Sequence, residues 1–272
     1  MTKIAGIVVY RPNTSRLMKN INAILGYVDE LIIYLNSSCE MLINNEKIKF
    51  LGDRTNKGMS YALNEIMNQA DIDGAEWCLL LDQDSIVLND FFLCYEEGVD
   101  LENVAILTPT ITYIDRKDNY DNSYINEVRT GITSGSYNKI SVWKELGGFR
   151  EDFFIDYVDW EFFARIRECG YKAYIIPSAK LSHELGRVTY HSLMGIRVQT
   201  YNHNSFRKYY ITRNSFAIHR LYPDWNEFRF PMLRSVKRFI IVLLFEDKKM
   251  EKVISMIKGY ISYRRFYGSS YN

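Results

Sequence analysis

The chain has 272 residues, of which 47% are hydrophobic and 25% are charged, and this composition excludes an intrinsically disordered protein. Its length accommodates one large α/β domain or two small ones. The net charge of +1 is unevenly distributed, because residues 229–272 contain ten Lys and Arg against three Asp and Glu. We interpret this asymmetry as a basic, surface-seeking C-terminal segment that follows a near-neutral body.

The first hundred residues alternate between apolar strands and helical periodicity. This order predicts a mostly parallel sheet with helices on its faces, which is an α/β fold. Neither G-x-G-x-x-G nor G-x-x-x-x-G-K-[ST] occurs, which argues against dehydrogenases and P-loop kinases. In chain order we predict strand 4–10, then a helix with its N-cap at Asn13 or Thr14 and apolar residues at helical spacing from 17 to 28. Strands 31–35 and 48–51 follow, then a helix that opens after Asn56-Lys57-Gly58, and strand 77–81.

The pattern beyond residue 104 is mixed. It predicts strands near 104–107 and 171–176 and a helix over about 159–169, with glycine-rich stretches at 131–136 and 146–149. No internal repeat or low-complexity linker interrupts the chain, so we treat residues 1–200 as one folded unit.

The four cysteines are widely spaced and form no C-x-x-C pair. Cys78 lies in an apolar stretch, where a cysteine usually serves as a small buried hydrophobic residue. This spacing does not indicate a disulfide scaffold, and the N-terminus shows no signal-peptide pattern. We therefore expect a protein of the reducing cytoplasm.

Polar residues follow three predicted strands at the points where these strands end. They are Tyr10-Arg11, Asn36-Ser37 and Asp82-Gln83-Asp84. Because the carboxyl ends of parallel strands meet at one edge of a sheet, these residues predict a nucleotide-sized crevice. Two acids one residue apart repel each other, and a hard divalent ion that bridges carboxylate to diphosphate relieves this repulsion. A solvated turn is the commoner explanation of a lone D-x-D, but the rest of the chain favours the metal.

Three acids lie among aromatic residues between Phe153 and Phe162, at Asp156, Asp159 and Glu161. A carboxylate at the helix start can simply be an N-cap, which explains Asp159 but explains three acids within six residues less well. A carboxylate beside aromatic walls suits a general base that takes a proton from a sugar hydroxyl.

Two further segments carry groups that suit a nucleotide diphosphate. His183 follows a strand and a proline turn; a lone histidine is usually structural, yet a neutral imidazole can also complete the coordination of Mn²⁺ or Mg²⁺ held by Asp84. Residues 207–214 cluster arginines with aromatics, which is either an ordinary helix face or a diphosphate clamp. Spacing alone leaves both questions open.

Seven short motifs occur in a fixed order, and each by itself is weak. Together they resemble family 2 glycosyltransferases of the GT-A fold, most of all bacterial rhamnosyltransferases, over about residues 3–215. The motifs are Val8–Asn13, Asn56–Gly58, Leu81–Ser85, Gly147–Phe149, Phe154–Asp159, His183–Gly186 and Tyr209–Asn214.

The resemblance implies that residues 1–100 bind the nucleotide and that residues 101–215 bind the acceptor. It implies Mg²⁺ or Mn²⁺ as cofactor, with Asp84 as the direct metal ligand and His183 as a second. The implied nucleotide-sugar site comprises Tyr10, Arg11, Asn36, Asn56, Gly58, Asp82, Gln83, Asp84 and Arg213. The implied acceptor contacts are Trp160 and Glu161.

The resemblance also implies Asp159 as the general base, since it precedes Arg165 by six residues, as the aspartate of the family's Glu-Asp motif does. Val158 occupies the place of the acidic partner, so Asp156 is the alternative base. The second strand ends in Leu35-Asn36-Ser37-Ser38 where the family has Asp-Asn-x-Ser. This departure bears on how the nucleotide base is recognised.

The implied reaction is inverting transfer of a sugar, with dTDP-L-rhamnose as donor and a growing surface polysaccharide or lipid-linked glycan as acceptor. A nucleotidyltransferase would share the sheet and the acids, but Arg11-Pro12-Asn13 is a poor version of its glycine-rich basic loop. A non-catalytic glycan-binding module would explain the aromatic residues but not the acids and His183. We expect no nucleic-acid partner.

Residues 216–272 are predicted to form an amphipathic helical extension. Their apolar run, 239–245, is far shorter than the roughly twenty residues that span a bilayer. Met250, Val253, Ile254, Ile257 and Ile261 then recur at helical spacing, with Lys252 and Lys258 on other faces. Such a helix can lie on an anionic membrane surface, or its stripe can pack on the body or on a second copy to form a homodimer.

Overall fold

The structure is a computed structural model that describes residues 1–39, 43–113, 124–183, 188–193 and 195–267. Contacts divide the chain into two compact units. Unit 1 comprises residues 1–154 and 158–184, and unit 2 comprises residues 155–157 and 185–272. The sequence analysis placed domain boundaries at 100 and 215 and one folded unit through 200, and these bounds stay a prediction.

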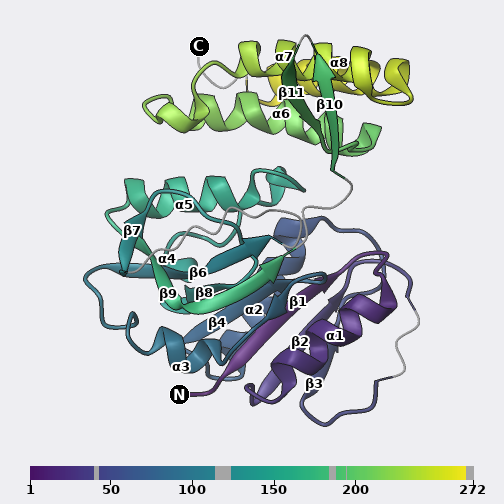
Figure 1. Cartoon of the computed structure of the whole chain (residues 1–272). Helices are drawn as coiled ribbons and strands as arrows, with labels where there is room; N and C mark the ends of the chain where they lie inside the picture. Colours follow the sequence, from purple (N-terminus) through teal and green to yellow (C-terminus); the bar gives the residue numbers. More distant parts are fainter. Residues whose placement is uncertain (40–42, 114–123, 184–187, 194, 268–272) are drawn as a thin grey trace. The chain divides into compact units, whose positions relative to one another are not determined.

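Unit 1 is built on a nine-stranded sheet (Figure 1). The strands are β1 (Ile4–Val9), β2 (Glu30–Leu35), β3 (Ile48–Leu51), β4 (Trp77–Asp82), β5 (Ile86–Val87), β6 (Val104–Tyr113), β7 (Asn126–Val128), β8 (Ser136–Lys139) and β9 (Lys172–His183). They follow the order β3-β2-β1-β4-β8-β6-β9-β5, with β7 paired to β9.

The direction of the strands differs between the two halves of this sheet. β3, β2, β1 and β4 are mutually parallel, as the alternation of strands and helices predicted. β8 pairs antiparallel with β4 and β6, and β5 pairs antiparallel with β9. The predicted α/β fold with a large central sheet is therefore confirmed, with several antiparallel pairs added.

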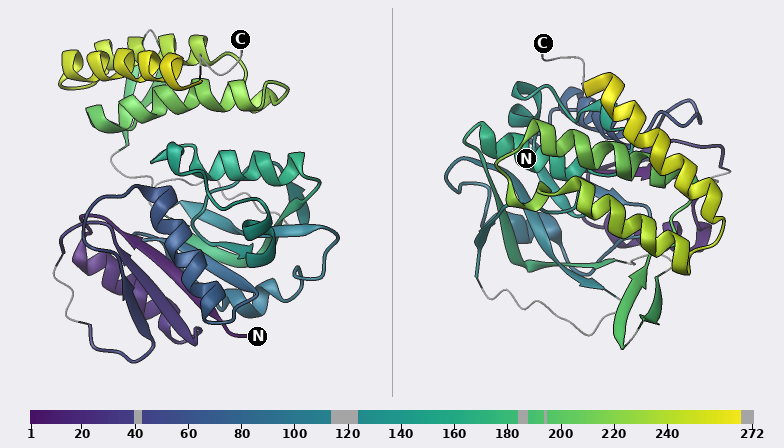
Figure 2. Two further views of the ribbon diagram at one scale, coloured as in Figure 1. Left: turned by 180° about the vertical axis from the view of Figure 1, so that it is seen from behind. Right: turned by 90° about the horizontal axis from the view of Figure 1, so that it is seen from above.

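Helices cover both faces of the sheet. They are α1 (Thr14–Leu25), α2 (Met59–Ile72), α3 (Phe91–Tyr95), α4 (Ile140–Glu145), η1 (Glu151–Phe153) and α5 (Val158–Glu168). Leu17 of α1 and Phe91 of α3 pack in one buried cluster with Ile7 of β1. On the opposite face (Figures 1 and 2), a Cβ on Gly6 would lie 2.1 Å from the Ile66 side chain of α2. A glycine in β1 therefore lets α2 approach the sheet closely.

Unit 2 contains a hairpin and a group of helices that lie side by side in the view from above (Figure 2). Its elements are β10 (Thr189–Leu193), β11 (Ile196–Thr200), α6 (Ser205–Leu221), η2 (Asn226–Phe228), α7 (Pro231–Phe245) and α8 (Lys249–Tyr267). Asn204 caps α6 by accepting a hydrogen bond from Arg207 N over 2.9 Å. A Cβ on Gly259 of α8 would lie 2.4 Å from the Tyr209 carbonyl oxygen of α6, so this glycine lets the two helices approach closely. Among the described residues, no helix combines the length and the apolar character needed to cross a membrane.

A buried group of charges joins the α7–α8 connection to α6. Glu246 is 4% exposed and pairs with Lys208 over 2.6 Å and with Lys252 over 3.0 Å. Lys252 also pairs with Asp247 over 2.7 Å. Because removing one partner would leave a buried charge uncompensated, these pairs fix how the three helices meet.

His203, just before α6, provides a test of this packing. Burial is the main cause that lowers the pKa of His203 to about 3, and the charges of Arg207 and Lys208 lower it further. In the unfolded chain the pKa of this imidazole is the ordinary 6.5, so between pH 6.5 and pH 3 the unfolded chain binds a proton that the folded protein does not. The free energy of unfolding is therefore highest above pH 6.5 and decreases as the pH falls toward 3. We expect His203→Gln to lose less stability than the unmodified protein between about pH 7 and pH 5 in urea unfolding. Equal losses would contradict a buried neutral imidazole.

Candidate functional site

The strand ends that the sequence analysis selected meet at one edge of the sheet, because β1 pairs in parallel register with both β2 and β4. Tyr10 N donates to Gln83 Oε1 over 2.8 Å, and Gln83 Nε2 donates to Tyr10 O over 3.1 Å. Arg11 N donates to Ser37 Oγ over 2.8 Å. These bonds join the ends of three strands that lie far apart in the sequence.

Asn36 connects the end of β2 to the loop before α2. Its Oδ1 accepts from Lys57 N over 2.8 Å, and its Nδ2 donates to Gly58 O over 3.2 Å. Gly58 N in turn donates to Asn56 Oδ1 over 3.1 Å. Gly58 has a φ of 96°, and a Cβ there would lie 2.7 Å from the Phe154 ring, so the loop requires glycine.

Asp82, Asp84 and His183 offer ligand atoms that all lie within 4.8 Å of one another. The antiparallel pairing of β5 with β9, with Ile86 opposite Ser182, brings His183 to the two acids. All three side chains are half-buried. Carboxylate oxygens suit Mg²⁺ and Mn²⁺, and imidazole favours a transition metal, so the donor set fits a divalent cation.

Two side chains of α1 hold the backbone of the Asp82–Asp84 turn. Asn20 Nδ2 donates to the Asp82 carbonyl oxygen over 2.7 Å, and Arg16 Nε donates to the Asp84 carbonyl oxygen over 2.7 Å. Asn20 is fully buried. These two hydrogen bonds therefore position the turn through its main chain.

Two buried serines connect the same turn to His183. Asp82 N donates to Ser134 Oγ over 2.9 Å, and Ser134 Oγ lies 2.7 Å from Ser85 Oγ. Ser85 Oγ lies 2.7 Å from His183 Nδ1, and both serines are fully buried. A hydrogen bond at Nδ1 fixes the ring plane and directs Nε2 away from the serine.

Asp159 is the second residue of α5. Its Oδ1 accepts a hydrogen bond from Trp160 N over 2.8 Å. Glu161 is fully buried and pairs with Arg165 over 2.9 Å, so its carboxylate stabilises the helix. The predicted roles of Asp159 as base and of Trp160 and Glu161 as acceptor contacts stay predictions.

Asp156 lies in unit 2, in a loop with unusual backbone angles. Asp156 has a φ of 63° and Tyr157 has a φ of 65°, and each such residue costs about 1–3 kcal/mol. Arg207 binds both carboxylate oxygens of Asp156, over 2.6 and 3.2 Å. Asn214 Nδ2 donates to the carbonyl oxygens of Ile155 and Asp156 over 2.9 and 2.8 Å. These bonds offset the strain and occupy the Asp156 carboxylate.

Arg213, the predicted diphosphate contact, also lies in unit 2. Its Nε donates to Asn214 Oδ1 over 2.9 Å, and its guanidinium lies 4.8 Å from the centre of the Tyr210 ring. Its predicted role stays a prediction. Of the motif that begins at His183, residues 184–186 lie outside the described residues.

Comparison with known proteins identifies one similar curated protein and several similar solved structures. No family model matches the chain. It is 27% identical over 265 residues to the dTDP-rhamnosyl transferase RfbF of Shigella flexneri, covering 88% of this chain and 85% of that protein.

Among solved structures, GalNAc-T7 with UDP, GalNAc and Mn²⁺ matches with a TM-score of 0.63 and 13% identity over 98% of this chain. The chain spans only 56% of GalNAc-T7. S. aureus TarS 1–349 in complex with UDP-GlcNAc matches with a TM-score of 0.60 and 14% identity, over 97% of this chain and 81% of TarS. The chain has the GT-A fold, and it is a glycosyltransferase. It is similar to rhamnosyltransferases.

Sequence reasoning missed several residues that position the site of this glycosyltransferase. Arg16 and Asn20 were assigned only to a helix, Ser85 only to the motif Leu81–Ser85, and Ser134 only to a glycine-rich stretch. Each bonds to a partner at least 49 residues away. A sequence pattern that extends over only a few residues does not predict such a pairing.

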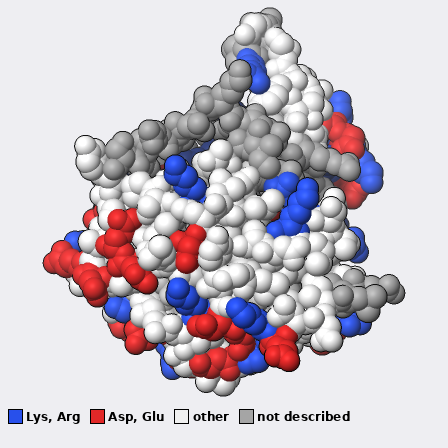
Figure 3. All heavy atoms as spheres, turned by 60° about the horizontal axis from the view of Figure 1, so that its bottom comes forward, with Lys and Arg blue, Asp and Glu red and all other residues white. Residues whose placement is uncertain are grey.

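The surface of the glycosyltransferase carries both signs of charge on the face shown in Figure 3. Acidic and basic side chains are interspersed there, with uncharged residues between them. This face therefore does not form a continuous basic surface of the kind that binds nucleic-acid backbones. The expectation of no nucleic-acid partner stays a prediction.

The serine connection to His183 makes a prediction about metal binding by this glycosyltransferase. Ser85→Ala should weaken Mn²⁺ binding by about 10–100-fold, the usual effect of losing a group that orients a metal ligand. The affinity can be measured without nucleotide sugar, from the EPR signal of free Mn²⁺. Ser136→Ala is the matched control, because this buried serine donates to the Thr133 carbonyl oxygen instead. Equal affinities for the two variants would contradict the positioning role of Ser85.

Proposed function

We propose that this glycosyltransferase moves L-rhamnose from dTDP-L-rhamnose onto a hydroxyl of a growing cell-surface polysaccharide or lipid-linked glycan, with inversion at the anomeric carbon. The observation that carries the proposal is the cluster of Asp82, Asp84 and His183 at the carboxyl edge of the sheet. Such an edge is where open α/β sheets bind ligands. The choice of donor rests on the similarity to a dTDP-rhamnosyl transferase.

The base in this proposal is Asp159. Its carboxylate takes the proton from the acceptor hydroxyl, and the oxygen attacks the anomeric carbon from the face opposite the leaving group. The new C–O bond forms as the bond to the diphosphate breaks, and the nucleoside diphosphate leaves with the electron pair. Positive charge develops on the sugar ring, as in inverting sugar hydrolysis.

Asp82, Asp84 and His183 would hold the divalent cation. A bound cation neutralises the negative charge that develops on the diphosphate as the bond to the sugar breaks. The protein supplies the fixed positions of the ligands through the hydrogen bonds of Asn20, Arg16 and Ser85. Mn²⁺ accompanies UDP in the solved GalNAc-T7 structure, which supports a metal at this edge.

Asp156 is the weaker candidate for the base. Both of its carboxylate oxygens are engaged by the Arg207 guanidinium. A carboxylate in a bidentate pair with a guanidinium must break that pair before it accepts a proton. We therefore retain Asp159 and treat Asp156 as part of the support of the loop.

The metal role predicts that Asp84→Asn loses the metal-dependent part of donor binding, by about 100-fold or more, because a direct ligand matters at least as much as the groups around it. Isothermal titration with dTDP-L-rhamnose, with and without Mn²⁺, measures this difference. Asp71→Asn is the control, since Asp71 forms a surface pair with Lys144. Donor binding by Asp84→Asn that still depends on metal would exclude Asp84 as a ligand.

The base assignment predicts that Asp159→Asn keeps donor affinity but slows transfer by about 10²–10⁴-fold, the usual contribution of a general base. Single-turnover transfer to a glycan acceptor measures the rate, and titration measures the affinity. Asp156→Asn should keep a measurable rate. The opposite ranking of the two variants would reassign the base.

The similarity to a dTDP-rhamnosyl transferase argues against the non-catalytic glycan-binding module that the aromatic residues suggested. Incubation with a panel of dTDP- and UDP-sugars and Mn²⁺ tests the proposed class of donor, because a transferase also hydrolyses its donor slowly. Binding of acceptor glycans without turnover of any sugar in the panel would contradict the proposal.

A further inference from the structure

The first helix of the C-terminal segment, α7, exposes most of its apolar side chains. Of its fifteen residues, only Pro231 and Val242 are buried. Seven apolar side chains are between 36% and 68% exposed. We call them the α7 apolar face: Met232, Leu233, Val236, Phe239, Ile240, Leu243 and Leu244. Scattered exposed apolar residues are normal, but a contiguous set marks an interaction surface.

The spacing of these residues places them together. They recur at intervals of three and four along the helix, so they share one side of α7. Val242 packs on another side, with Val253 and Met256 of α8. α7 is thus apolar both on the side that packs on α8 and on the exposed side. A helix that is apolar on both sides is usually buried on both.

The last helix, α8, repeats this arrangement. Met250, Ile254, Ile257 and Ile261 are between 44% and 69% exposed and also recur at intervals of four and three. Val253, which the sequence analysis placed in the same stripe, is 8% exposed. The predicted stripe therefore divides into an inward part and an outward row.

The charges around these apolar residues are mainly positive. Among the described residues from 229 to 265, seven cations and two acids are exposed. The exposed cations are Arg229, Lys237, Lys248, Lys249, Lys258, Arg264 and Arg265, and the exposed acids are Asp247 and Glu251. α7 itself contains three cations and no acid.

We propose that the α7 apolar face and the outward row of α8 dock on the surface of an anionic lipid bilayer. Apolar side chains enter the boundary between headgroups and acyl chains, and the surrounding cations contact the anionic headgroups. A second copy of the chain fits less well, because it would bring two surfaces with the same excess of positive charge together. The proposal is independent of the reaction, since it involves no residue of the metal cluster.

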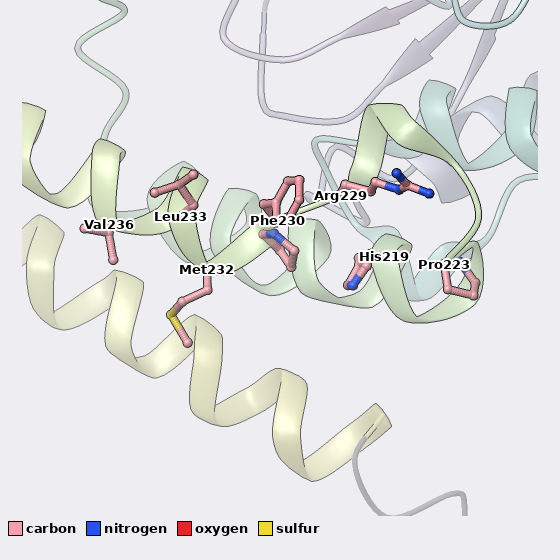
Figure 4. Close-up of a pocket in the computed structure, with 8 residues that line it drawn as sticks. His219, Pro223, Arg229, Phe230, Met232, Leu233 and Val236 are labelled. Carbon is pink, nitrogen blue, oxygen red and sulfur yellow. The ribbon is translucent and has the colours of Figure 1, made fainter.

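A pocket at the start of α7 supports a lipid as occupant (Figure 4). Its volume is about 610 Å³, and Met232, Leu233 and Val236 of the α7 apolar face line it. The end of α6 contributes His219, whose Nδ1 is buried without a hydrogen-bond partner among the described residues. Arg229 is the cation of the wall. An apolar hollow that a cation helps to line suits a hydrocarbon chain that carries an anionic headgroup.

The experiment is flotation of the full chain with vesicles, without donor or acceptor. We expect binding to phosphatidylcholine vesicles that contain phosphatidylglycerol, weaker binding to pure phosphatidylcholine, and a decrease with added salt. Leu233→Glu combined with Ile240→Glu should lower the partition coefficient by about tenfold or more. Lys237→Gln combined with Lys258→Gln should lower binding to the anionic vesicles alone, by about fivefold for each charge.

A matched pair of substitutions controls for added charge and for stability. Ile72→Glu combined with Leu93→Glu changes two apolar residues of unit 1 that are 75% and 63% exposed. This variant should bind vesicles like the unmodified protein. Phe230→Trp adds a probe beside the face, and its additional fluorescence should be quenched by lipids brominated in the acyl chains.

Several outcomes would overturn the proposal. They are equal flotation of the Leu233/Ile240 and Ile72/Leu93 variants, no preference for anionic vesicles, or no added quenching at Phe230→Trp. Light scattering after gel filtration tests for the competing occupant, a second copy of the chain. If the unmodified protein forms a stable dimer and does not bind vesicles, and if the Leu233/Ile240 variant is a monomer, the face belongs to a second copy. Loss of flotation with unchanged transfer to a short soluble acceptor would separate this surface from the proposed reaction.

Discussion

The hydrogen bonds to the backbone of the Asp82–Asp84 turn are the constraint on which the candidate site depends, because they hold two carboxylates close together at one edge of the sheet. At the 4.8 Å that bounds the cluster, two like charges repel by about 3 kcal/mol at an effective dielectric constant of about 20. A flexible turn would relieve this repulsion by separating the acids. Here Asn20 and Arg16 bind the carbonyl oxygens of the turn, and Ser134 binds the amide of Asp82. The sheet edge therefore keeps the acids together and ready for a cation.

The sequence was informative where a property is local. The apolar runs predicted β1, β2 and β4, and the polar residues after each predicted which edge would carry the site. The position of Asp82 at the end of a buried strand could be read directly. These features follow from hydrophobic periodicity within a few residues, so no knowledge of long-range pairing was needed.

Other parts of the site could not be derived in this way. His183 reaches the acids because β9 pairs antiparallel with the two-residue strand β5, which is too short to give a periodic signal. β8 has the sequence Ser-Tyr-Asn-Lys, yet it is inserted between β4 and β6. In the C-terminal segment, periodicity predicted a stripe but not that Val253 packs inward while Ile254 stays exposed. Which side of a helix is buried depends on the elements that pack on it, and the sequence of that helix alone does not specify those elements.

Asp156 and Asp159 are three residues apart, yet their surroundings differ. Asp156 lies in a strained loop that Arg207 and Asn214 hold from α6. Asp159 lies in the first turn of α5, where unpaired backbone N–H groups favour a carboxylate. Only Tyr157 and Val158 separate the two acids in the sequence, yet Asp156 belongs to unit 2 and Asp159 to unit 1. The two acids therefore have different structural roles: the Asp156 carboxylate holds its loop to α6 through Arg207, whereas the Asp159 carboxylate lies at the start of a helix of unit 1.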